Sequence, residues 1–169
     1  MGRRFKYREL EEATNDFRED NRLGDGASGV VYRGIIDNRQ VAIKRLGIDE
    51  TRFIESKWQF DVEVLTIRRA NHPNIVEFSG FCAEGNRRLV LYEYMALGSL
   101  DNLLRVSAVD PPLLMIFRDM KSANILLGEG YKPKLSDFGN TIDGPVGDQT
   151  YITTGDAMGT HGYIAPEYQ

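Results

Sequence analysis

The chain has 169 residues, of which 41% are hydrophobic and 27% charged, and its formal net charge is −4. This profile predicts one globular domain with a real core and excludes a disordered chain, and the acidic balance argues against nucleic acid as the main partner. The single cysteine excludes an intrachain disulfide framework and fits a reducing compartment. No apolar run approaches the ~18 residues that span a bilayer, so we expect a cytoplasmic protein without a transmembrane segment.

The first 20 residues read as a polar flank. Within "FKYRELEEATNDF", Leu10, Ala13 and Phe17 recur at helical spacing, which predicts a short helix. The flank also carries four basic side chains: Arg3, Arg4, Lys6 and Arg8. These charges either contact acidic lipid or are simply solvated, and we expect any association with the inner face of the plasma membrane to run through partners.

The next stretch alternates strands with one helix. "NRLGDGASGVVYRGIIDNRQVAIKRL" holds two apolar, β-branched runs separated by the turn signal Asp37-Asn38, and "NIVEFSGFC" and "RRLVLYEYM" read as two further strands. Between them, "ESKWQFDVEVLTIRRA" changes to helical spacing. The apolar residues near one face of this helix are Trp58, Val62, Leu65 and Ala70. The second half of the chain is irregular, with short apolar runs at "LLMIF" and "NILL".

A glycine pattern precedes the first of these apolar runs. Gly24, Gly26 and Gly29 form Gly-x-Gly-x-x-Gly, which also occurs in dinucleotide-binding folds and in plain turns. A dinucleotide fingerprint opens a helix after its last glycine, whereas here a strand continues through Val31. The context therefore favours a hairpin whose backbone amides lie over phosphates, with a plain hairpin as the alternative.

The motif "VAIK" ends in Lys44 on the following strand. A buried lysine requires a counter-charge or an anion, and Glu63 on the next helix is the natural partner. Such a pair holds the ammonium ready for the phosphates of a nucleotide. The alternative is a surface lysine and an ordinary solvated helix acid.

Two further motifs carry acids. In "FRDMKSANILL", Asp119, Lys121 and Asn124 have the spacing of a proton acceptor, a lysine that steadies a transferred phosphoryl group, and a magnesium ligand. In "SDFG", Asp137 is suited to bridge the metal and the phosphates. The chain then ends with "GTHGYIAPEYQ", which contains an Ala-Pro-Glu anchor. Six signals in this order exclude coincidence.

With these motifs the chain resembles the eukaryotic protein kinases, and within them the plant receptor-like and receptor-like cytoplasmic serine/threonine kinases. That branch is indicated by "FKYRELEEATNDF", "HPNIVEFSGFC", "LVLYEYMALGSL" and "MKSANILL". The resemblance implies an α+β kinase fold, with a five-stranded antiparallel N-lobe sheet, one main helix and an incomplete C-lobe. The implied divisions are an N-terminal flank at 1–20, the N-lobe and hinge at 21–95, and a partial C-lobe at 96–169.

The resemblance also implies ATP and Mg²⁺ as cofactors and assigns roles by matching position. Asp119 accepts the substrate proton, Lys121 favours serine and threonine over tyrosine, Lys44 pairs with Glu63, and Asn124 and Asp137 hold magnesium. The implied nucleotide-binding residues are Leu23, Gly24, Gly26, Gly29, Val31, Ala42, Lys44, Tyr92 as gatekeeper, Glu93, Met95 and Leu126. Thr153 and Thr154 are either activation-loop phosphosites or ordinary solvated loop residues.

The chain departs from the family pattern in four places. Phe117 replaces the usual His, and Asn140 begins a polar stretch after Asp-Phe-Gly. Only 12 residues separate Leu104 from Phe117, where the family has two helices, and nothing but Tyr-Gln follows the Ala-Pro-Glu anchor that ends at Glu167. We therefore expect a chain truncated within the C-lobe, with weaker support for the catalytic loop.

Two functions from different classes follow. The first is a serine/threonine protein kinase that transfers the γ-phosphoryl group of ATP to protein hydroxyls in signalling, with a receptor or another kinase as partner. The alternative is an impaired fragment or pseudokinase that binds a nucleotide or a partner without transferring phosphate. A product of truncated or mis-spliced coding sequence, with no selected role, is a third possibility.

Overall fold

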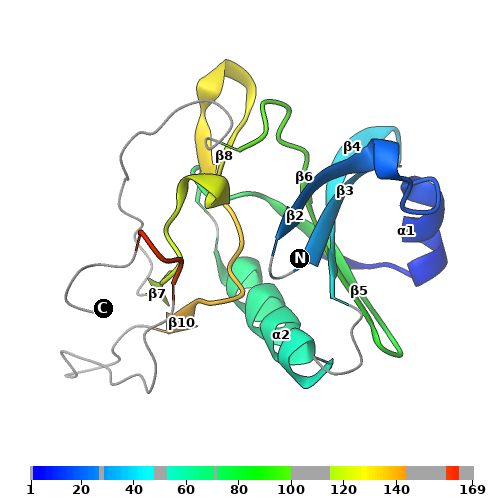
Figure 1. Ribbon diagram of the computed structural model, residues 1–169. Coiled ribbons are helices and arrows are strands. Elements are labelled where there is room, and N and C mark those ends of the chain that lie inside the picture. Colours follow the sequence, from blue (N-terminus) through cyan, green and yellow to red (C-terminus); the bar gives the residue numbers. More distant parts are fainter. Residues whose placement is uncertain are drawn as a thin grey trace.

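The computed structural model describes residues 2–26, 29–47, 53–70, 72–99, 115–143 and 159–163. Its helices and strands are shown in Figure 1. The helices are α1 (Tyr7–Ala13) and α2 (Phe53–Arg69), with short 3₁₀ turns η1 (Glu19–Asn21), η4 (Ser122–Asn124) and η5 (Glu129–Tyr131). The strands are β1 (Arg3–Arg4), β2 (Arg22–Gly26), β3 (Gly29–Ile36), β4 (Arg39–Leu46), β5 (Phe78–Glu84), β6 (Arg87–Glu93), β7 (Met115–Ile116), β8 (Ile125–Leu127), β9 (Pro133–Leu135) and β10 (Ile142–Asp143).

The main sheet has six strands, in the order β1-β5-β6-β4-β3-β2. Five of them form the expected antiparallel array, and the sixth, β1, comes from the flank and pairs with β5 in parallel. Glycine at position 80 permits this pairing, because a Cβ atom there would lie 2.2 Å from the carbonyl oxygen of Arg3. The Phe5 amide then donates to the Phe81 carbonyl at 2.8 Å. The kinase-like α+β prediction is confirmed, with one strand more than expected.

The turn expected at Asp37-Asn38 joins β3 to β4. Both residues have positive φ, 48° and 60°, and Ile36 pairs with Arg39 across the turn. A two-residue hairpin of this handedness matches the twist of its strands and favours Asp and Asn. The hairpin places Lys44 opposite Val31 on β3, and β6 then places Val90 on its other side.

The sheet carries a hydrophobic core on each face, and α1 and α2 lie on opposite sides of it (Figure 1). Successive residues of a strand alternate between the faces, which is why Ala42 and Val41 belong to different cores. The core beneath α2 consists of Ala42, Leu46, Phe60, Val64, Ile67, Ile75, Val76, Val90, Tyr92, Met95 and Phe138. The core beneath the flank consists of Phe5, Tyr7, Leu10, Val41, Ile43, Cys82, Leu89 and Leu91.

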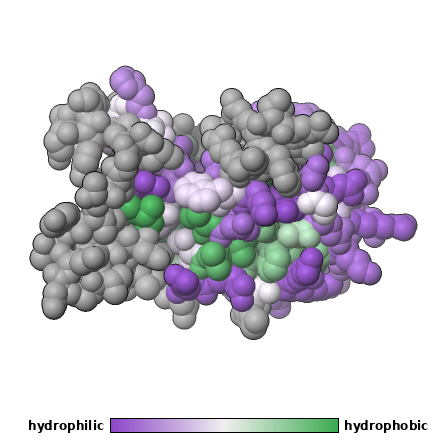
Figure 2. Space-filling view, turned by 90° about the horizontal axis from the view of Figure 1, so that it is seen from below, coloured by the Kyte–Doolittle hydropathy of each residue, from purple (hydrophilic) through white to green (hydrophobic). Residues whose placement is uncertain are grey.

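Helix α2 buries a different face from the one that its apolar spacing suggested. Trp58 and Leu65 are 48% and 54% exposed, whereas Phe60, Glu63 and Ile67 are buried. The helix has apolar residues on both sides, and the side with Glu63 faces the sheet, where Lys44 lies. Figure 2, seen from below, shows apolar surface among hydrophilic side chains on the side of the molecule where α2 lies in Figure 1.

The described elements after residue 114 are short. β8 and β9 form an antiparallel hairpin, and β7 pairs with β10. A backbone hydrogen bond of 3.0 Å from Val76 to Leu135 connects the hairpin with the first half of the chain. The segment expected to lack family helices lies outside the described residues except for β7. Within the described part of the chain, neither helix is both long and apolar enough to cross a membrane.

Candidate active site

The centre of the site is a buried lysine between two carboxylates. Lys44 Nζ lies 3.1 and 3.0 Å from the two carboxylate oxygens of Glu63 and 2.8 Å from Oδ1 of Asp137. Lys44 is 5% exposed and Glu63 is fully buried. The expected Lys44–Glu63 pair is therefore present, and the surface alternative is wrong. Three separate elements meet here: strand β4, helix α2 and the segment after β9.

Tyr92 completes this network from the neighbouring strand. Its hydroxyl donates to Oε1 of Glu63, so the buried carboxylate is bound from two sides. Burial alone would lower the pKa of Lys44, but the charges of Glu63 and Asp137 raise it, and the ammonium form is held. Burial raises the pKa of Tyr92, and the Glu63 charge adds to that rise. The sequence placed Tyr92 at the nucleotide but did not indicate its contact with Glu63.

The predicted catalytic loop, residues 119–124, gathers its polar side chains around Asp119. Lys121 Nζ lies 2.8 Å from Asp119 Oδ2, and the Asn124 side-chain nitrogen donates to the Asp119 carbonyl at 2.9 Å. Asp119 and Asn124 are each 5% exposed. The loop is tied to the next segment, because both the amide and the hydroxyl of Ser136 donate to the Asn124 carbonyl, at 2.8 and 3.0 Å. These contacts hold the two predicted polar motifs beside each other.

The Asp-Phe-Gly segment has a constrained backbone. Asp137 has φ of 64°, a left-handed conformation that costs a non-glycine residue free energy and recurs at functional sites. Phe138 is buried against Phe117, with ring centroids 5.3 Å apart in an edge-to-face arrangement. Phe117, which replaces the usual His, therefore packs its ring against the Asp-Phe-Gly segment. Arg118 donates to the Asn140 carbonyl at 2.7 Å and links the two segments again.

The predicted nucleotide positions surround the same region. Ala42 and Met95 are buried in the core beneath α2, and Val31 and Leu126 pack against it. Leu23, near the edge of the sheet, is 46% exposed. The glycines of the β2–β3 hairpin differ in what a Cβ atom would contact. At Gly29, with φ of 139°, it would lie 2.3 Å from the Arg45 carbonyl oxygen. At Gly24 and Gly26 it would have no neighbour within 4 Å in the described part of the chain.

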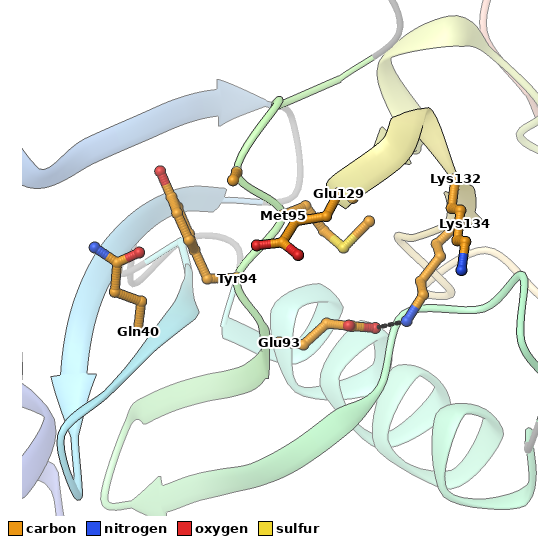
Figure 3. Close-up of a pocket in the computed structure, with 9 residues that line it drawn as sticks. Gln40, Glu93, Tyr94, Met95, Glu129, Lys132 and Lys134 are labelled. Carbon is orange, nitrogen blue, oxygen red and sulfur yellow. Dashed lines mark hydrogen bonds and ion pairs between the residues drawn. The ribbon is translucent and has the colours of Figure 1, made fainter.

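A separate cavity of about 470 Å³ lies beside the connection between the two halves (Figure 3). It shares Glu93 and Met95 with the predicted nucleotide positions, but it does not reach Lys44. Its remaining lining residues are Gln40, Tyr94, Ala96, Gly128, Glu129, Lys132 and Lys134. The dashed line in Figure 3 marks the ion pair between Lys134 Nζ and Glu93 Oε1, 2.6 Å apart. This pair joins β9 to the end of β6.

The described part of the last segment contacts the predicted catalytic loop. Thr160 Oγ1 donates to Asp119 Oδ1 at 2.5 Å and accepts from Lys121 Nζ at 3.0 Å. The predicted phosphosites Thr153 and Thr154, and the Ala-Pro-Glu anchor at 165–167, lie outside the described residues.

Comparison with known proteins decides the family. The family model described as protein tyrosine and serine/threonine kinase matches residues 17–114, more than half of the chain. The chain belongs to the protein kinases. Among curated kinases of Arabidopsis thaliana, it is 43% identical to the probable serine/threonine-protein kinase PBL5 over 97% of its own length and 44% of that protein. It is 43% identical to the probable serine/threonine-protein kinase PBL21, over 98% and 50%, and 40% identical to the serine/threonine-protein kinase PBS1, over 97% and 41%.

These relatives confirm the resemblance to plant receptor-like cytoplasmic serine/threonine kinases. The kinase chain spans about half, or less, of the length of each relative named here. The family match begins at residue 17, yet Phe5, Tyr7 and Leu10 are buried in the core of the kinase sheet. The flank therefore shares a core with the strands of the sheet.

Proposed function

We propose that this chain binds ATP with Mg²⁺ and transfers the γ-phosphoryl group to serine and threonine hydroxyls of protein substrates in signalling. The observation that carries the proposal is Lys44, buried and in contact with both Glu63 and Asp137. This contact brings a phosphate-binding cation beside a carboxylate suited to magnesium. The names of the relatives support serine/threonine transfer. These names favour an active kinase over the alternative of an impaired fragment.

The hairpin glycines support a site for phosphates. Among the residues that the structure describes, neither a neighbouring atom nor a positive φ requires glycine at Gly24 and Gly26. The close approach of a ligand is a sufficient reason for glycine at both positions, since a Cβ atom would keep phosphate oxygens away from the backbone amides. At Gly29 the protein itself requires glycine, because a Cβ atom there would collide with the Arg45 carbonyl oxygen.

The donor atoms in the site also fit magnesium. Asn124 uses its side-chain nitrogen for Asp119, so its side-chain oxygen is the atom offered to a cation. Asp137 is partly exposed, and it follows Ser136, whose amide donates to the Asn124 carbonyl. Carboxylate and amide oxygens are ligands that Mg²⁺ accepts. When bound, the ion would neutralise charge on the phosphates.

Different residues of the site have different roles in the proposed transfer. Lys44 orients the phosphates, because its ammonium is held in place by two carboxylates. Asp119 accepts the proton of the substrate hydroxyl on its carboxylate. Thr160 and Lys121 hold that carboxylate in position through contacts with different oxygens. A cytoplasmic location, and a receptor or kinase partner at the membrane, are part of this proposal.

Calorimetric titration with ATP and magnesium tests binding. We expect saturable binding by the whole chain, weakened at least tenfold in Lys44→Ala, because that variant loses the cation beside the phosphates. Lys132→Ala, which removes an exposed lysine in the separate cavity, is the matched control and should bind as the unmodified chain does. A folded chain that shows no saturable binding would contradict the proposal.

Transfer is tested separately with a mixture of serine-, threonine- and tyrosine-containing peptides. Phosphate should appear on serine and threonine, and Asp119→Asn should lower transfer at least about a hundredfold while MgATP binding remains. Binding without any transfer would support the nucleotide-binding module instead.

A further inference from the structure

The end of the described chain forms a tight turn at residues 159–163. Its backbone closes through a hydrogen bond of 3.0 Å from the Tyr163 amide to the Thr160 carbonyl. Two glycines with positive φ shape it, Gly159 at 150° and Gly162 at 88°. Glycine-containing turns lose more conformational entropy on ordering than other turns do, so this turn requires external contacts to stay in one place.

The external contacts are hydrogen bonds to the catalytic loop. Thr160 contacts Asp119 and Lys121, as described above. At the other end of the turn, the Tyr163 hydroxyl lies 2.9 Å from Ser122 Oγ, and either oxygen can be the donor. Both ends of the turn are therefore attached to consecutive parts of one loop.

Apolar burial does not hold the Tyr163 end of the turn. The tyrosine is 52% exposed, and the residues before it, Thr160 and His161, are polar. Ser122, in contrast, is 8% exposed and begins η4, the short turn that carries Asn124. The hydrogen bond between the Tyr163 hydroxyl and the hydroxyl of the buried Ser122 thus fixes this half-exposed ring.

We propose that Tyr163 is a positioning residue, which acts through its hydrogen bond with Ser122 to hold the 159–163 turn so that Thr160 stays on the Asp119 carboxylate. This role rests on the proposed phosphotransfer, and it assigns Tyr163 no contact with the reacting atoms. A carboxylate that accepts a proton needs a fixed orientation, and loss of that orientation lowers turnover more than nucleotide binding.

The first test does not need activity. Quench-flow hydrogen exchange on the whole chain measures the protection of the 159–163 backbone, with rates corrected for sequence. We expect exchange about three- to tenfold faster in Tyr163→Phe and in Ser122→Ala, the change that loss of one net hydrogen bond produces. The double variant should exchange no faster than the faster of the two single variants, because the shared hydrogen bond is already lost in each of them.

Tyr131→Phe is the matched control, since Tyr131 is 68% exposed and lies on η5, in another part of the chain. It should leave exchange of the turn unchanged. Unchanged exchange in Tyr163→Phe would overturn the proposal, as would fully additive effects in the double variant.

The second test separates positioning from a structural role. With MgATP and a serine peptide, Tyr163→Phe should lower kcat about fivefold while KM for ATP stays the same, and Tyr131→Phe should change neither. An unchanged kcat would overturn the positioning role. Should the chain transfer no phosphate, the proposed function fails while hydrogen exchange still decides whether Tyr163 and Ser122 hold the turn.

Discussion

The two halves of the kinase chain are held together by different interactions. Among the described residues, the large side chains with almost no exposure come from Leu10 through Leu91, with Phe138 as the exception. After residue 114 the buried side chains are mostly polar: Asp119, Ser122, Asn124 and Thr141. The first half is stabilised by apolar burial and the second by directed hydrogen bonds. Stability and chemistry are therefore expected to respond to different substitutions.

Ion pairs and apolar packing couple the halves, in addition to backbone hydrogen bonds such as the one from Val76 to Leu135. Asp137 binds Lys44, Lys134 binds Glu93, and Phe138 is inserted into the core beneath α2. The two ion pairs are short, at 2.8 and 2.6 Å, so the second half is oriented on the first by charge as well as by packing.

The largest expected effect is on the rate of phosphotransfer, with stability almost unchanged. Asp119→Asn should lower phosphotransfer by about 10²- to 10⁴-fold, because the amide accepts a proton poorly. The free energy of unfolding should change by less than about 1 kcal/mol, since asparagine keeps an acceptor oxygen for Thr160. Radiolabelled phosphate transfer and urea unfolding measure the two quantities. Asp61→Asn, on the exposed side of α2, is the control. A large loss of stability in Asp119→Asn would contradict the view that stability and chemistry depend on different residues.

The next effect is on stability alone. Leu10→Ala removes a fully buried side chain and should lower the free energy of unfolding by about 2–5 kcal/mol. Urea denaturation followed by circular dichroism measures the change. Glu11→Ala in the same helix, at a half-exposed position, is the matched control. An effect of Leu10→Ala as small as that of the control would mean that the flank is not part of the N-lobe core.

A smaller effect is expected at a polar contact inside the apolar half. Tyr92→Phe leaves the ring but removes the hydroxyl that donates to the buried Glu63, and it should lower the free energy of unfolding by about 1–2 kcal/mol. Tyr94→Phe, in the separate cavity, is the control. Equal stability of Tyr92→Phe and the unmodified chain would show that the Lys44 pair alone satisfies Glu63.

The smallest effect is a dependence on alkaline pH. Burial raises the pKa of the Cys82 thiol from 9.0 to about 11. As pH rises, the thiol of the unfolded chain ionises before that of the folded chain. The contribution of the neutral, buried thiol to the free energy of unfolding is therefore complete below pH 9 and is lost as pH rises towards 11. By pH 10 the loss should be about 1 kcal/mol. Urea unfolding at pH 8, 9 and 10 measures it, with Cys82→Ala as the comparison; an equal decline in that variant would exclude the thiol as the cause.

Much of the first half was predictable from local patterns. The β3–β4 turn followed from Asp37-Asn38, because few residues tolerate its backbone, and the strands followed from their apolar, β-branched runs. The pairing of Lys44 with Glu63 followed from the cost of burying either charge alone. The sixth strand was not predictable, since two arginines carry no strand pattern and their pairing depends on the absence of a side chain at Gly80.

The sequence by itself therefore determined the protein family, the order of the motifs and the residue types that the site requires. Only the tertiary structure decided which face of α2 is buried, because both faces are apolar and the attraction between Glu63 and Lys44 selects one. It also decided that Tyr92 reaches Glu63 and that Tyr163 reaches Ser122. Such contacts join residues far apart in the chain, and a hydrogen bond depends on a separation of about 3 Å that no local pattern encodes.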